Sequence, residues 1–460
     1  MNPVAFDTLP LKADLLKNLS SLGYDAMTAI QAESLPAILD GKDVIGQGKT
    51  GSGKTAAFAL GILNKLNVER FRIQSLVLCP TRELADQVSQ EIRRLARTIH
   101  NIKVLTLCGG QPFGPQALSL EHGAHIIVGT PGRIEDHLGR GTLSLEHVGL
   151  VVLDEADRML EMGFQDSLDA IFEQVPAQRQ TLLFSATYPK QIKAIAGRIL
   201  RDPVTAHAQE THDHSSIEQH FYRVDDAQRS EALQRLLMTF RPESTVVFCN
   251  TKAETQGLAD DLSHHGFSAI ALHGDLEQRE RDETLVRFAN RSAAILVATD
   301  VAARGLDIDN LDAVVNYHIA HDPEQHTHRI GRTGRAGSKG LALSLYSEDE
   351  ARKLALLEGD VDPIRDSEPL PAAKVIDGDP IGATMVTLQI DGGKKQKLRP
   401  GDILGALTGK GGVKGQQVGK INVFDNWTYV AVEKNVSKLA LNKLGKDKLK
   451  GRSFRVRRIA

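Results

Sequence analysis

The chain alternates short apolar runs with longer stretches in which apolar and polar residues recur at helical spacing. From Val44 to about Pro203 the apolar runs include DVIGQ, SLVLCP, HIIVGT, LVVLDEAD and TLLFSAT. Strand-like runs separated by helical stretches are typical of βαβ units, which build a parallel sheet covered on both faces. A second alternation follows in TVVFCNT, SAIALHGD, AAILVATD, AVVNYHI and GLALSLY. The pattern therefore predicts two similar α/β domains in tandem.

Two polar segments interrupt this pattern and are predicted to be linkers. AHAQETHDHSS separates the two alternations, and DVDPIRDSEPLPAAKVIDGDP, rich in Pro and Asp, follows the second. After it, short strand-like pieces, Gly-rich turns and two helical stretches predict a small α+β module. The predicted parts are residues 1–205 and 206–360 for the α/β domains, 361–380 for a linker, and 381–460 for the module.

Composition is that of a globular protein, because 41% of the residues are hydrophobic and 25% are charged. These values exclude collagen-like, disordered and disulfide-scaffold classes. The N-terminal segment has no basic stretch before an apolar run, and no run of about 18 apolar residues occurs. We therefore expect a cytoplasmic protein. The three cysteines, Cys79, Cys108 and Cys249, lie in or beside apolar runs without metal-ligand spacing, and are expected in the core.

The net charge of −2 hides a strong division along the chain. Residues 370–460 contain 18 Lys and Arg against 7 Asp and Glu, a balance of +11. The preceding residues contain 38 against 51, a balance of −13. Because nucleic-acid affinity depends on where cations cluster, the module is the part with the electrostatic character of a nucleic-acid binder.

GKTGSGKT meets the GxxxxGK[ST] pattern of a phosphate-binding loop, between a predicted strand and a predicted helix. Its glycines let backbone N–H groups surround phosphate oxygens at a helix N-terminus. Lys54 is expected to reach the β and γ phosphates, and the Thr55 hydroxyl to bind Mg²⁺. The alternative is a simple glycine-rich turn. The predicted ATP contacts are Gly48, Lys49, Thr50, Gly51, Ser52, Gly53, Lys54 and Thr55.

LVVLDEAD places acids at the end of an apolar strand, at the edge of the sheet where ligands bind. Asp154 is predicted to be a Mg²⁺ ligand. Glu155 is predicted to orient and deprotonate the attacking water beside the γ phosphate. The alternative is that these acids merely favour the dipole of the following helix.

HRIGRTGR places Arg332 and Arg335 three residues apart in the second α/β domain. If the two domains close on one nucleotide, both can act as arginine fingers, which contribute roughly 10³- to 10⁵-fold in rate. An isolated Arg-rich turn is more often solvated surface, and the two preceding motifs favour the catalytic interpretation. The neighbouring histidines 318, 321, 326 and 328 lack the spacing of a known metal site, so we expect no structural metal.

Taken together and in this order, the motifs resemble those of the DEAD-box family of superfamily 2 RNA helicases, from about Phe6 to Gly337. The resemblance implies two tandem RecA-like, doubly wound parallel-sheet domains. GYDAMTAIQ resembles the Q motif of the family, which implies that Gln31 reads the adenine edge and that Phe6 stacks on the base. Met27 and Ala29 stand where the family usually has prolines, and Gly48 stands where it commonly has alanine.

Further strings resemble the RNA-gripping motifs of the family, although each by itself is also compatible with a helix cap or turn. In the first domain, PTRELA, a glycine pair and TPGR imply RNA contacts at Pro80, Thr81, Arg82, Gly109, Gly110, Thr130, Pro131, Gly132 and Arg133. In the second domain the implied RNA contacts or supports are Thr251, Arg281, Thr299 and Asp300. Gly305 and Asp307 are implied to contact ATP. SAT implies that Ser185 and Thr187, with Asp157, couple hydrolysis to strand separation.

The basic module resembles the RRM-like domain of the DbpA type of DEAD-box protein, a type directed to large-subunit ribosomal RNA. MVTLQIDGGKKQKLRPGDILGALTG and VGKINVFDNWTYVAV carry this likeness. The aromatic pattern on which an ordinary RRM stacks bases is absent around WTYVAV, so recognition is expected to use cations. The alternative for each cation is a solubilising charged edge. The candidate phosphate contacts are Lys394, Lys395, Lys397, Arg399, Arg452, Arg455, Arg457 and Arg458.

The resemblance thus implies an ATP-dependent RNA helicase that hydrolyses ATP when RNA stimulates it, and that locally unwinds or remodels RNA. The expected cofactors are ATP and Mg²⁺, and the expected partners are large-subunit ribosomal RNA and pre-ribosomal particles, with the chain acting as a monomer. Two alternatives remain open. One is an ATP-gated RNA clamp without productive unwinding, and the other is a DNA translocase, which the RNA-enzyme motifs disfavour.

Overall fold

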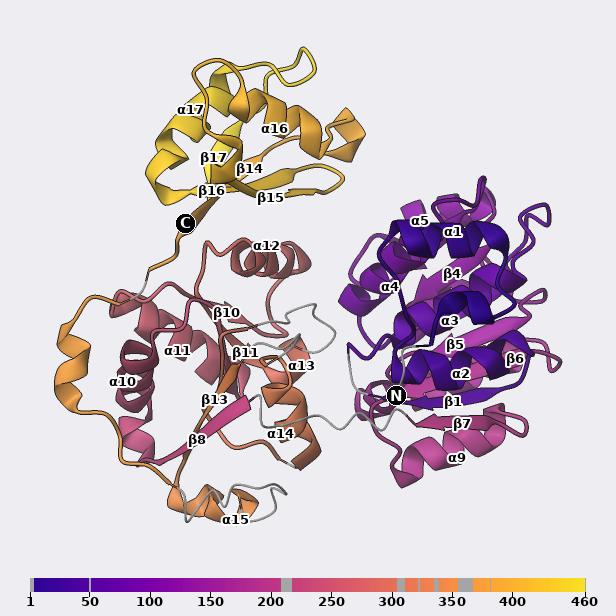
Figure 1. Cartoon of the computed structure of the whole chain (residues 1–460), viewed down its shortest axis with the longest axis horizontal. Coiled ribbons are helices and arrows are strands. Elements are labelled where there is room, and N and C mark those ends of the chain that lie inside the picture. The colour runs from indigo at the N-terminus through magenta and orange to yellow at the C-terminus, as the bar shows by residue number, and fades with distance from the viewer. Residues whose placement is uncertain are drawn as a thin grey trace. The chain divides into compact units, whose positions relative to one another are not determined.

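The computed structural model describes residues 4–48, 51–207, 217–303, 311–321, 323–334, 339–354, 367–380 and 382–459. The chain forms two compact units, of which the first is built from residues up to about 212. The second contains most of the remaining chain, including the basic module. The order of the elements is drawn in Figure 1.

The first unit contains a seven-stranded parallel sheet in the order β3-β4-β2-β5-β6-β1-β7. Its strands are β1 (Val44–Gln47), β2 (Ser75–Leu78), β3 (Val104–Leu107), β4 (Ile126–Gly129), β5 (Leu150–Leu153), β6 (Gln180–Ser185) and β7 (Val204–His207). Its helices are α1 (Ala13–Ser21), α2 (Ala29–Leu39), α3 (Lys54–Lys65), α4 (Arg82–Leu95), α5 (Phe113–Glu121), α6 (Pro131–Gly139), α7 (Ala156–Glu161), α8 (Gln165–Gln174) and α9 (Lys190–Ile199).

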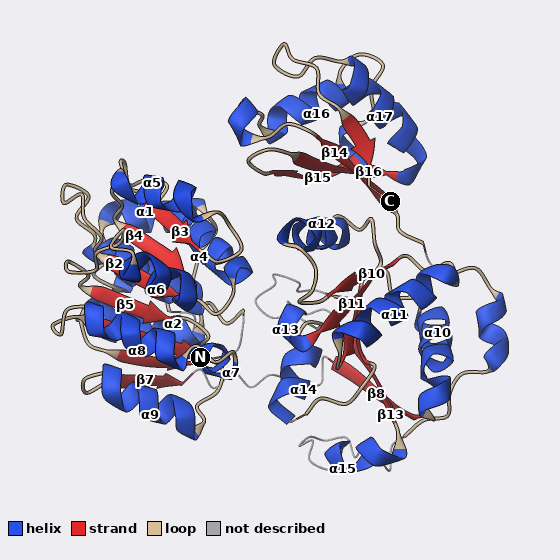
Figure 2. Cartoon of the chain, turned by 180° about the vertical axis from the view of Figure 1, so that it is seen from behind, coloured by secondary structure: helices blue, strands red, loops and turns tan. Residues whose placement is uncertain are grey.

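The continuous apolar runs of the sequence become strands that are buried on both faces. Val77 and Val152 belong to one core cluster, which also contains residues of α2, α3 and α4. Leu76 and Val151 point the other way, into a second cluster with residues of α7, α8 and α9. Because successive side chains of a strand alternate between faces, both faces need helices, and Figure 2 shows helices on both sides of the sheet.

The second unit begins with a six-stranded parallel sheet in the order β10-β11-β9-β12-β13-β8. Its strands are β8 (Ile217–Arg223), β9 (Thr245–Cys249), β10 (Ala269–Leu272), β11 (Ile295–Thr299), β12 (Ala313–Asn316) and β13 (Gly340–Tyr346). Its helices are α10 (Arg229–Phe240), α11 (Lys252–His264), α12 (Gln278–Ala289), α13 (Asp300–Ala303), α14 (Pro323–Ile330) and α15 (Ala351–Leu354). The prediction of two parallel-sheet α/β domains is confirmed.

The basic module folds around a four-stranded antiparallel sheet in the order β15-β16-β14-β17. Its elements are β14 (Met385–Ile390), α16 (Pro400–Thr408), β15 (Val418–Val423), β16 (Thr428–Glu433), α17 (Ser437–Lys446) and β17 (Val456–Arg458). This β-α-β-β-α-β order, with a core between the sheet and both helices, is the arrangement expected of an RRM-like domain. The α+β prediction is therefore confirmed as well.

The described part of the predicted linker, residues 367–380, runs along the second α/β domain. Glu368 donates its backbone N–H to the carbonyl of Phe221 at 2.8 Å, and its carboxylate contacts the His220 ring at 2.6 Å. Farther along, the Arg235 side chain donates to the carbonyl of Pro371 at 3.4 Å. These contacts hold this segment against β8 and α10.

The cysteines are buried and unpaired as free thiols, as their place in apolar runs predicts. Burial raises the pKa of Cys108 to about 12 and that of Cys79 well above its ordinary value, so both stay protonated at neutral pH. Among the helices of the described residues, none combines the length and apolar character needed to cross a membrane.

Candidate nucleotide and RNA site

The strand order of the first sheet sorts the motifs into two groups. All strands are parallel, so their carboxyl ends meet at one edge of the sheet. The phosphate loop, the acidic motif and SAT follow β1, β5 and β6, which are neighbours. The glycine pair, TPGR and PTRELA follow β3, β4 and β2, which form the adjacent part of the edge. The sheet thus places the candidate nucleotide residues together and the candidate RNA residues beside them.

The first residue of the phosphate loop, Gly48, is bonded both to the sheet and to the first residue of α3. Gly48 donates its backbone N–H to the carbonyl of Ser185 at 3.1 Å, and the Lys54 ammonium donates to the carbonyl of Gly48. Gly53 has a left-handed φ of 96°, and a Cβ there would lie 2.5 Å from the Gln31 side-chain nitrogen. The loop therefore needs glycine at this position. Lys49 and Thr50 lie outside the described residues.

Residues of the Q motif support the phosphate loop from behind. The Thr28 hydroxyl donates to the carbonyl of Ser52 at 2.7 Å, and the Gln31 side chain donates to the carbonyl of Gly53 at 3.1 Å. Gln31 also accepts from the Thr28 backbone at 2.9 Å, which completes a capping box at the start of α2. Thr28 is a supporting residue that the sequence analysis did not identify.

Phe6 is a core residue in this structure. Its side chain is 4% exposed, and its ring meets Tyr24 edge-on with the centroids 6.2 Å apart. Its stacking on adenine stays a prediction, as does the reading of the adenine edge by Gln31.

The acidic motif forms a buried carboxylate cluster beside the phosphate loop. Asp154 is 2% exposed and Glu155 is 7% exposed. Burial raises the pKa of Asp154 to about 7, while the Lys54 ammonium opposes this rise and the Glu155 carboxylate adds to it. Burial disfavours the charged form of Asp154, and a bound cation would stabilise that form. The acidic residues therefore fit a Mg²⁺ ion that arrives with a nucleotide.

Glu155 stands at a strained position. Its backbone lies in the left-handed region, with φ at 52° and ψ at 54°, as the residue before α7. Non-glycine residues cost energy in this region and persist where the surroundings hold them. Such strain is common at active sites, which favours the catalytic interpretation of Glu155 over a simple helix-dipole role.

Asp157 connects the acidic motif to SAT. Its carboxylate accepts from the Thr187 backbone at 3.0 Å and from the Thr187 hydroxyl at 2.9 Å. The Asp157 backbone N–H donates to the Ser185 hydroxyl at 3.3 Å. The three residues predicted to couple hydrolysis to strand separation therefore lie in direct contact.

The candidate RNA residues of the first domain sit at helix starts and turns. Thr81 caps α4 by accepting from the Leu84 backbone at 3.2 Å. Thr130 precedes Pro131 at the start of α6, and its hydroxyl accepts from Gly109 at 3.4 Å, so two of the motifs touch. These contacts give Thr81 and Thr130 structural roles. The contact of these motifs with RNA phosphates stays a prediction.

The two arginines of these motifs differ in their surroundings. Arg133 donates twice to the carbonyl of Gln111, at 3.0 Å each, which braces the glycine turn after β3. Arg82 is 9% exposed at the start of α4, in the middle of the sheet edge. Their direct contact with RNA stays a prediction.

The candidate RNA residues of the second domain also lie after neighbouring strands of a parallel sheet. Thr251 follows β9, and Thr299 and Asp300 lie at the end of the adjacent β11. Arg281 lies on α12, after the neighbouring β10. Thr251 caps α11 by accepting from the Glu254 backbone at 3.2 Å.

Arg329 is a residue whose role the sequence analysis missed. Its guanidinium, 1% exposed, pairs with both oxygens of Asp300 at 2.7 and 2.6 Å. It also donates to the carbonyl of His318 at 2.7 Å. Arg329 thus joins the end of β11 to the helix that precedes Arg332. HRIGRTGR contains it, but nothing in the string marks it as more buried than its neighbours.

Arg332 lies just after α14 and is 9% exposed. Its carbonyl accepts from the Leu311 backbone at 3.2 Å, which fixes the turn that carries the side chain. Its role as an arginine finger stays a prediction. The other candidates of this domain, Arg335, Gly305 and Asp307, lie outside the described residues.

His318 belongs to a partly buried ion network. Its ring contacts the carboxylates of Glu254 at 2.6 Å and Glu350 at 3.2 Å, and Arg229 pairs with Glu350 at 2.8 Å. Burial opposes the charged forms, but the hydrogen bonds prevail: the pKa of His318 is raised above 6.5, and that of Glu350 falls from 4.5 to about 2. Within the described residues, no group of three His, Cys, Asp or Glu is placed to hold a metal ion.

We expect this network to make the second domain most stable in mildly acidic solution. The depressed pKa of Glu350 stabilises the fold above pH 4.5, and this contribution is lost as the pH falls through about 2. The raised pKa of His318 stabilises it below pH 6.5, and that contribution is lost as the pH rises through the folded value. We therefore expect amide hydrogen exchange in α10, corrected for its intrinsic pH dependence, to be slowest between pH 4.5 and pH 6.5. In Glu350→Gln the rate of exchange in α10 should depend less on pH. The exposed control Glu348→Gln should keep the pH dependence of the unmodified protein. An unaltered pH dependence in Glu350→Gln would contradict the prediction.

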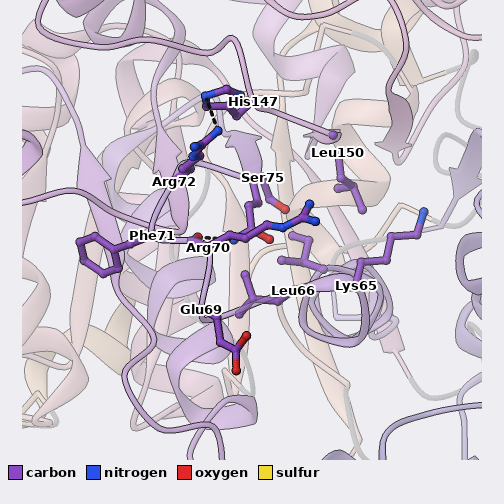
Figure 3. Close-up of a pocket in the computed structure, with 12 residues that line it drawn as sticks. Lys65, Leu66, Glu69, Arg70, Phe71, Arg72, Ser75, His147 and Leu150 are labelled. Atoms are coloured by element: carbon purple, nitrogen blue, oxygen red, sulfur yellow. Dashed lines mark hydrogen bonds between the residues drawn. The ribbon is translucent and has the colours of Figure 1, made fainter.

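A cavity of about 810 Å³ opens at the other end of the first sheet. Ser75 and Leu150, the first residues of β2 and β5, line it together with Lys65 and Arg70 (Figure 3). Figure 3 also shows Arg72 bonded to His147, at 3.1 Å. None of the candidate nucleotide residues lines this cavity, and ligands of parallel sheets bind at the carboxyl ends, so we do not assign the nucleotide to it.

The candidate cations of the module are exposed and fall on two stretches. Lys394, Lys395 and Lys397 form a tight turn after β14, and Arg399 precedes α16. The four arginines lie on the last stretch of chain around β17, and one of them, Arg457, donates to the Gln389 side chain at 2.8 Å. Their contact with RNA stays a prediction.

Three family models match successive parts of the chain. The DEAD/DEAH box helicase model matches residues 28–195, and the helicase conserved C-terminal domain matches residues 228–337. The DbpA RNA binding domain matches residues 387–458, within the basic module. Each match includes most of the strands of one of the three sheets described above.

Similar proteins cover all or most of this chain. The ATP-dependent RNA helicase DbpA of Escherichia coli is 55% identical over 98% of this chain and 99% of its own length. The DEAD-box ATP-dependent RNA helicase CshA of Geobacillus kaustophilus is 46% identical over 77% of this chain and 76% of its own length. Among solved structures, Saccharomyces cerevisiae Dbp5 bound to RNA and ADP BeF3 is similar with a TM-score of 0.68 and 28% identity, covering 81% of this chain and 98% of that one.

Proposed function

Because this chain belongs to the DEAD-box family of ATP-dependent RNA helicases, as a helicase of the DbpA type, we propose that it remodels large-subunit ribosomal RNA during ribosome assembly. It is an RNA-dependent ATPase that binds RNA. The observation that carries ATP-driven remodelling of RNA is the shared sheet edge, where the nucleotide motifs of β1, β5 and β6 adjoin the RNA motifs of β2, β3 and β4. In this proposal a change at one half of the edge acts on the other half, because β5 and β2 are adjacent strands.

In the proposed mechanism, the phosphate loop and Lys54 bind the phosphates of ATP, and Glu155 takes the proton of the attacking water. Asp154 and the Thr55 hydroxyl would hold Mg²⁺, which neutralises the phosphate charge when it is bound. Arg332 and Arg335 supply positive charge to the γ phosphate when the two α/β domains close. Loss of this phosphate then removes the contacts that hold the closed state.

RNA is held by its backbone in this proposal. Helix starts and small residues, as at Thr81, Gly109 and Thr130, present N–H groups that suit phosphates. When the two α/β domains close, they bend the RNA strand that they hold, and the bend excludes the complementary RNA strand. Stacking is worth about 1.4 kcal/mol per base-pair step on the DNA scale, so one binding event separates only a few pairs.

The preference for ribosomal RNA is assigned to the basic module. Its balance of +11 over residues 370–460 stands against −13 in the rest of the chain. The exposed lysine turn and the terminal arginines supply cations that can release counterions from RNA phosphates. We propose that the module docks the helicase in pre-ribosomal particles.

The test combines two assays on the full chain. We expect fragments of large-subunit ribosomal RNA to stimulate the ATPase more strongly than unrelated RNA or DNA of equal length. We also expect ATP-dependent displacement of a short duplex joined to the most stimulating fragment. Stimulation without displacement would favour the ATP-gated clamp, and equal stimulation by DNA would favour a translocase.

A further inference from the structure

One face of the module's sheet is covered although its own helices lie on the other face. Thr387, Gln389 and Tyr429 are at most 1% exposed, and they alternate along β14 and β16 with core residues such as Leu388 and Val430. Because side chains of a strand alternate between faces, these three point away from α16 and α17. In an ordinary RRM this face stacks bases.

The segment that covers this face belongs to the second α/β domain, at α12 and the turn after it. The Ser292 and Thr387 hydroxyls are hydrogen-bonded at 2.6 Å, and the Asn290 side chain donates to the Thr387 hydroxyl at 3.4 Å. The Met385 backbone donates to the carbonyl of Arg291 at 3.3 Å. The C-terminal end of α12 is thereby fixed to β14.

The N-terminal end of α12 makes a different contact with the module. The Arg279 guanidinium lies over the Trp427 ring, 5.3 Å from its centroid. Trp427 follows the turn between β15 and β16 and is the single tryptophan of the chain. The charge of Arg279 also acts on the pKa of Tyr429, which burial raises to about 12. Arg279 is therefore beside the covered face, at the first turn of α12.

The first turn of α12 is held by polar contacts and not by buried side chains, and one of these contacts joins the Arg281 side chain to the carbonyl of His273 at 3.4 Å. The buried residues of the helix, Thr284, Val286 and Phe288, all lie in its second half. The first turn is held by a capping box between Glu277 and Glu280 and carries Arg281, whose family motif implies an RNA contact. A contact at Arg279 thus acts on the part of the helix with the least packing.

We propose that Trp427 is a positioning residue: by holding Arg279 it fixes the first turn of α12 and places Arg281 for the RNA backbone. The proposal rests on the proposed RNA role of Arg281. It gives the module a second task besides binding its own RNA, since a docked module strengthens the grip of the second α/β domain on RNA. An exposed cation–π contact corresponds to about a two- to fivefold equilibrium effect.

The test uses Arg279→Gln and Arg279→Lys in the full chain, with Arg223→Gln as control. Arg223 is an exposed arginine of the same domain that pairs with Glu348 instead. With ribosomal RNA as activator, Arg279→Gln should raise the KM for RNA about two- to fivefold without changing kcat, and Arg279→Lys should recover most of the loss. Trp427 emission should shift in Arg279→Gln, and the signal is unambiguous because no other tryptophan is present.

The outcomes separate this proposal from the one on which it rests. If Arg279→Gln behaves like Arg223→Gln while Arg281→Gln raises the KM for RNA, the positioning role of Trp427 is wrong. If Arg281→Gln also leaves the KM unchanged, the RNA role of Arg281 fails instead, and with it the proposal. A merely structural contact would shift the emission of Trp427 and leave the KM for RNA unchanged, which also overturns the positioning role.

Discussion

Glu155→Gln should stop ATP turnover while the protein still binds ATP and RNA. A general base contributes roughly 10²- to 10⁴-fold, and the amide cannot accept the proton of the attacking water. The side chain is 7% exposed and sits in a strained backbone, so the isosteric amide keeps the packing of the acidic motif. We expect kcat to fall by this factor, with ATP binding nearly unchanged in equilibrium titrations. RNA should dissociate more slowly, because the closed state is no longer reset by hydrolysis.

The control for this prediction is Glu161→Gln, at the exposed end of α7. It removes one carboxylate from the helix that follows Glu155 without changing the buried cluster, and should leave kcat close to that of the unmodified protein. Rapid release of RNA by Glu155→Gln in the presence of ATP would contradict the proposed cycle, even if hydrolysis were abolished.

Removal of residues 381–460 should abolish the preference for ribosomal RNA and leave the basal ATPase intact. The nucleotide residues of the first sheet lie in a different unit, so the deletion leaves their surroundings in place. The deletion removes the exposed cations of the module, so we expect the affinity for ribosomal RNA to fall at least about tenfold, or 1.4 kcal/mol, to the level of unrelated RNA. Competition binding at fixed salt, with ATPase measured without RNA, tests both halves. Persistence of the preference would refute the targeting role.

A milder variant keeps the fold of the module. Lys394→Gln, Lys395→Gln and Lys397→Gln together neutralise the exposed turn after β14 without touching the core. If these cations bind phosphates, the slope of log affinity against log salt should become shallower by about 0.7 to 0.9 for each phosphate that is no longer neutralised. The matched control neutralises the exposed Lys438 and Lys446 on α17 and Lys448 just after it, which the prediction does not assign to RNA. Equal effects in both triple variants would indicate nonspecific attraction.

Much of the fold followed from patterns that local physics enforces. Apolar runs such as Leu150–Leu153 are buried on both faces, and a strand with this composition suits a central position in a parallel sheet. GKTGSGKT was interpretable because its glycines occupy positions, such as Gly53, that a side chain would block. The roles of the individual site residues remain predictions, since the described residues bring them together without a ligand to contact.

Other features depended on residues far apart in the chain. Thr28 supports the phosphate loop through Ser52, and Arg329 neutralises Asp300 across 29 positions. Gln31 and Phe6 were assigned to adenine from the resemblance, and the structure adds that Gln31 holds Gly53 and that Phe6 is buried. None of these interactions has a periodic signature, because they are set by which strands become neighbours.

The sequence by itself determined the class of each domain, the order of the motifs and the separation of a basic module from an acidic body. These depend on the spacing of apolar residues and on charge, which are properties of short segments. Only the tertiary structure decided that nucleotide and RNA motifs occupy adjacent halves of one sheet edge, and that α12 covers the face of β14 and β16. Strand order and domain docking are decided by packing between distant segments, and packing leaves no mark in local sequence.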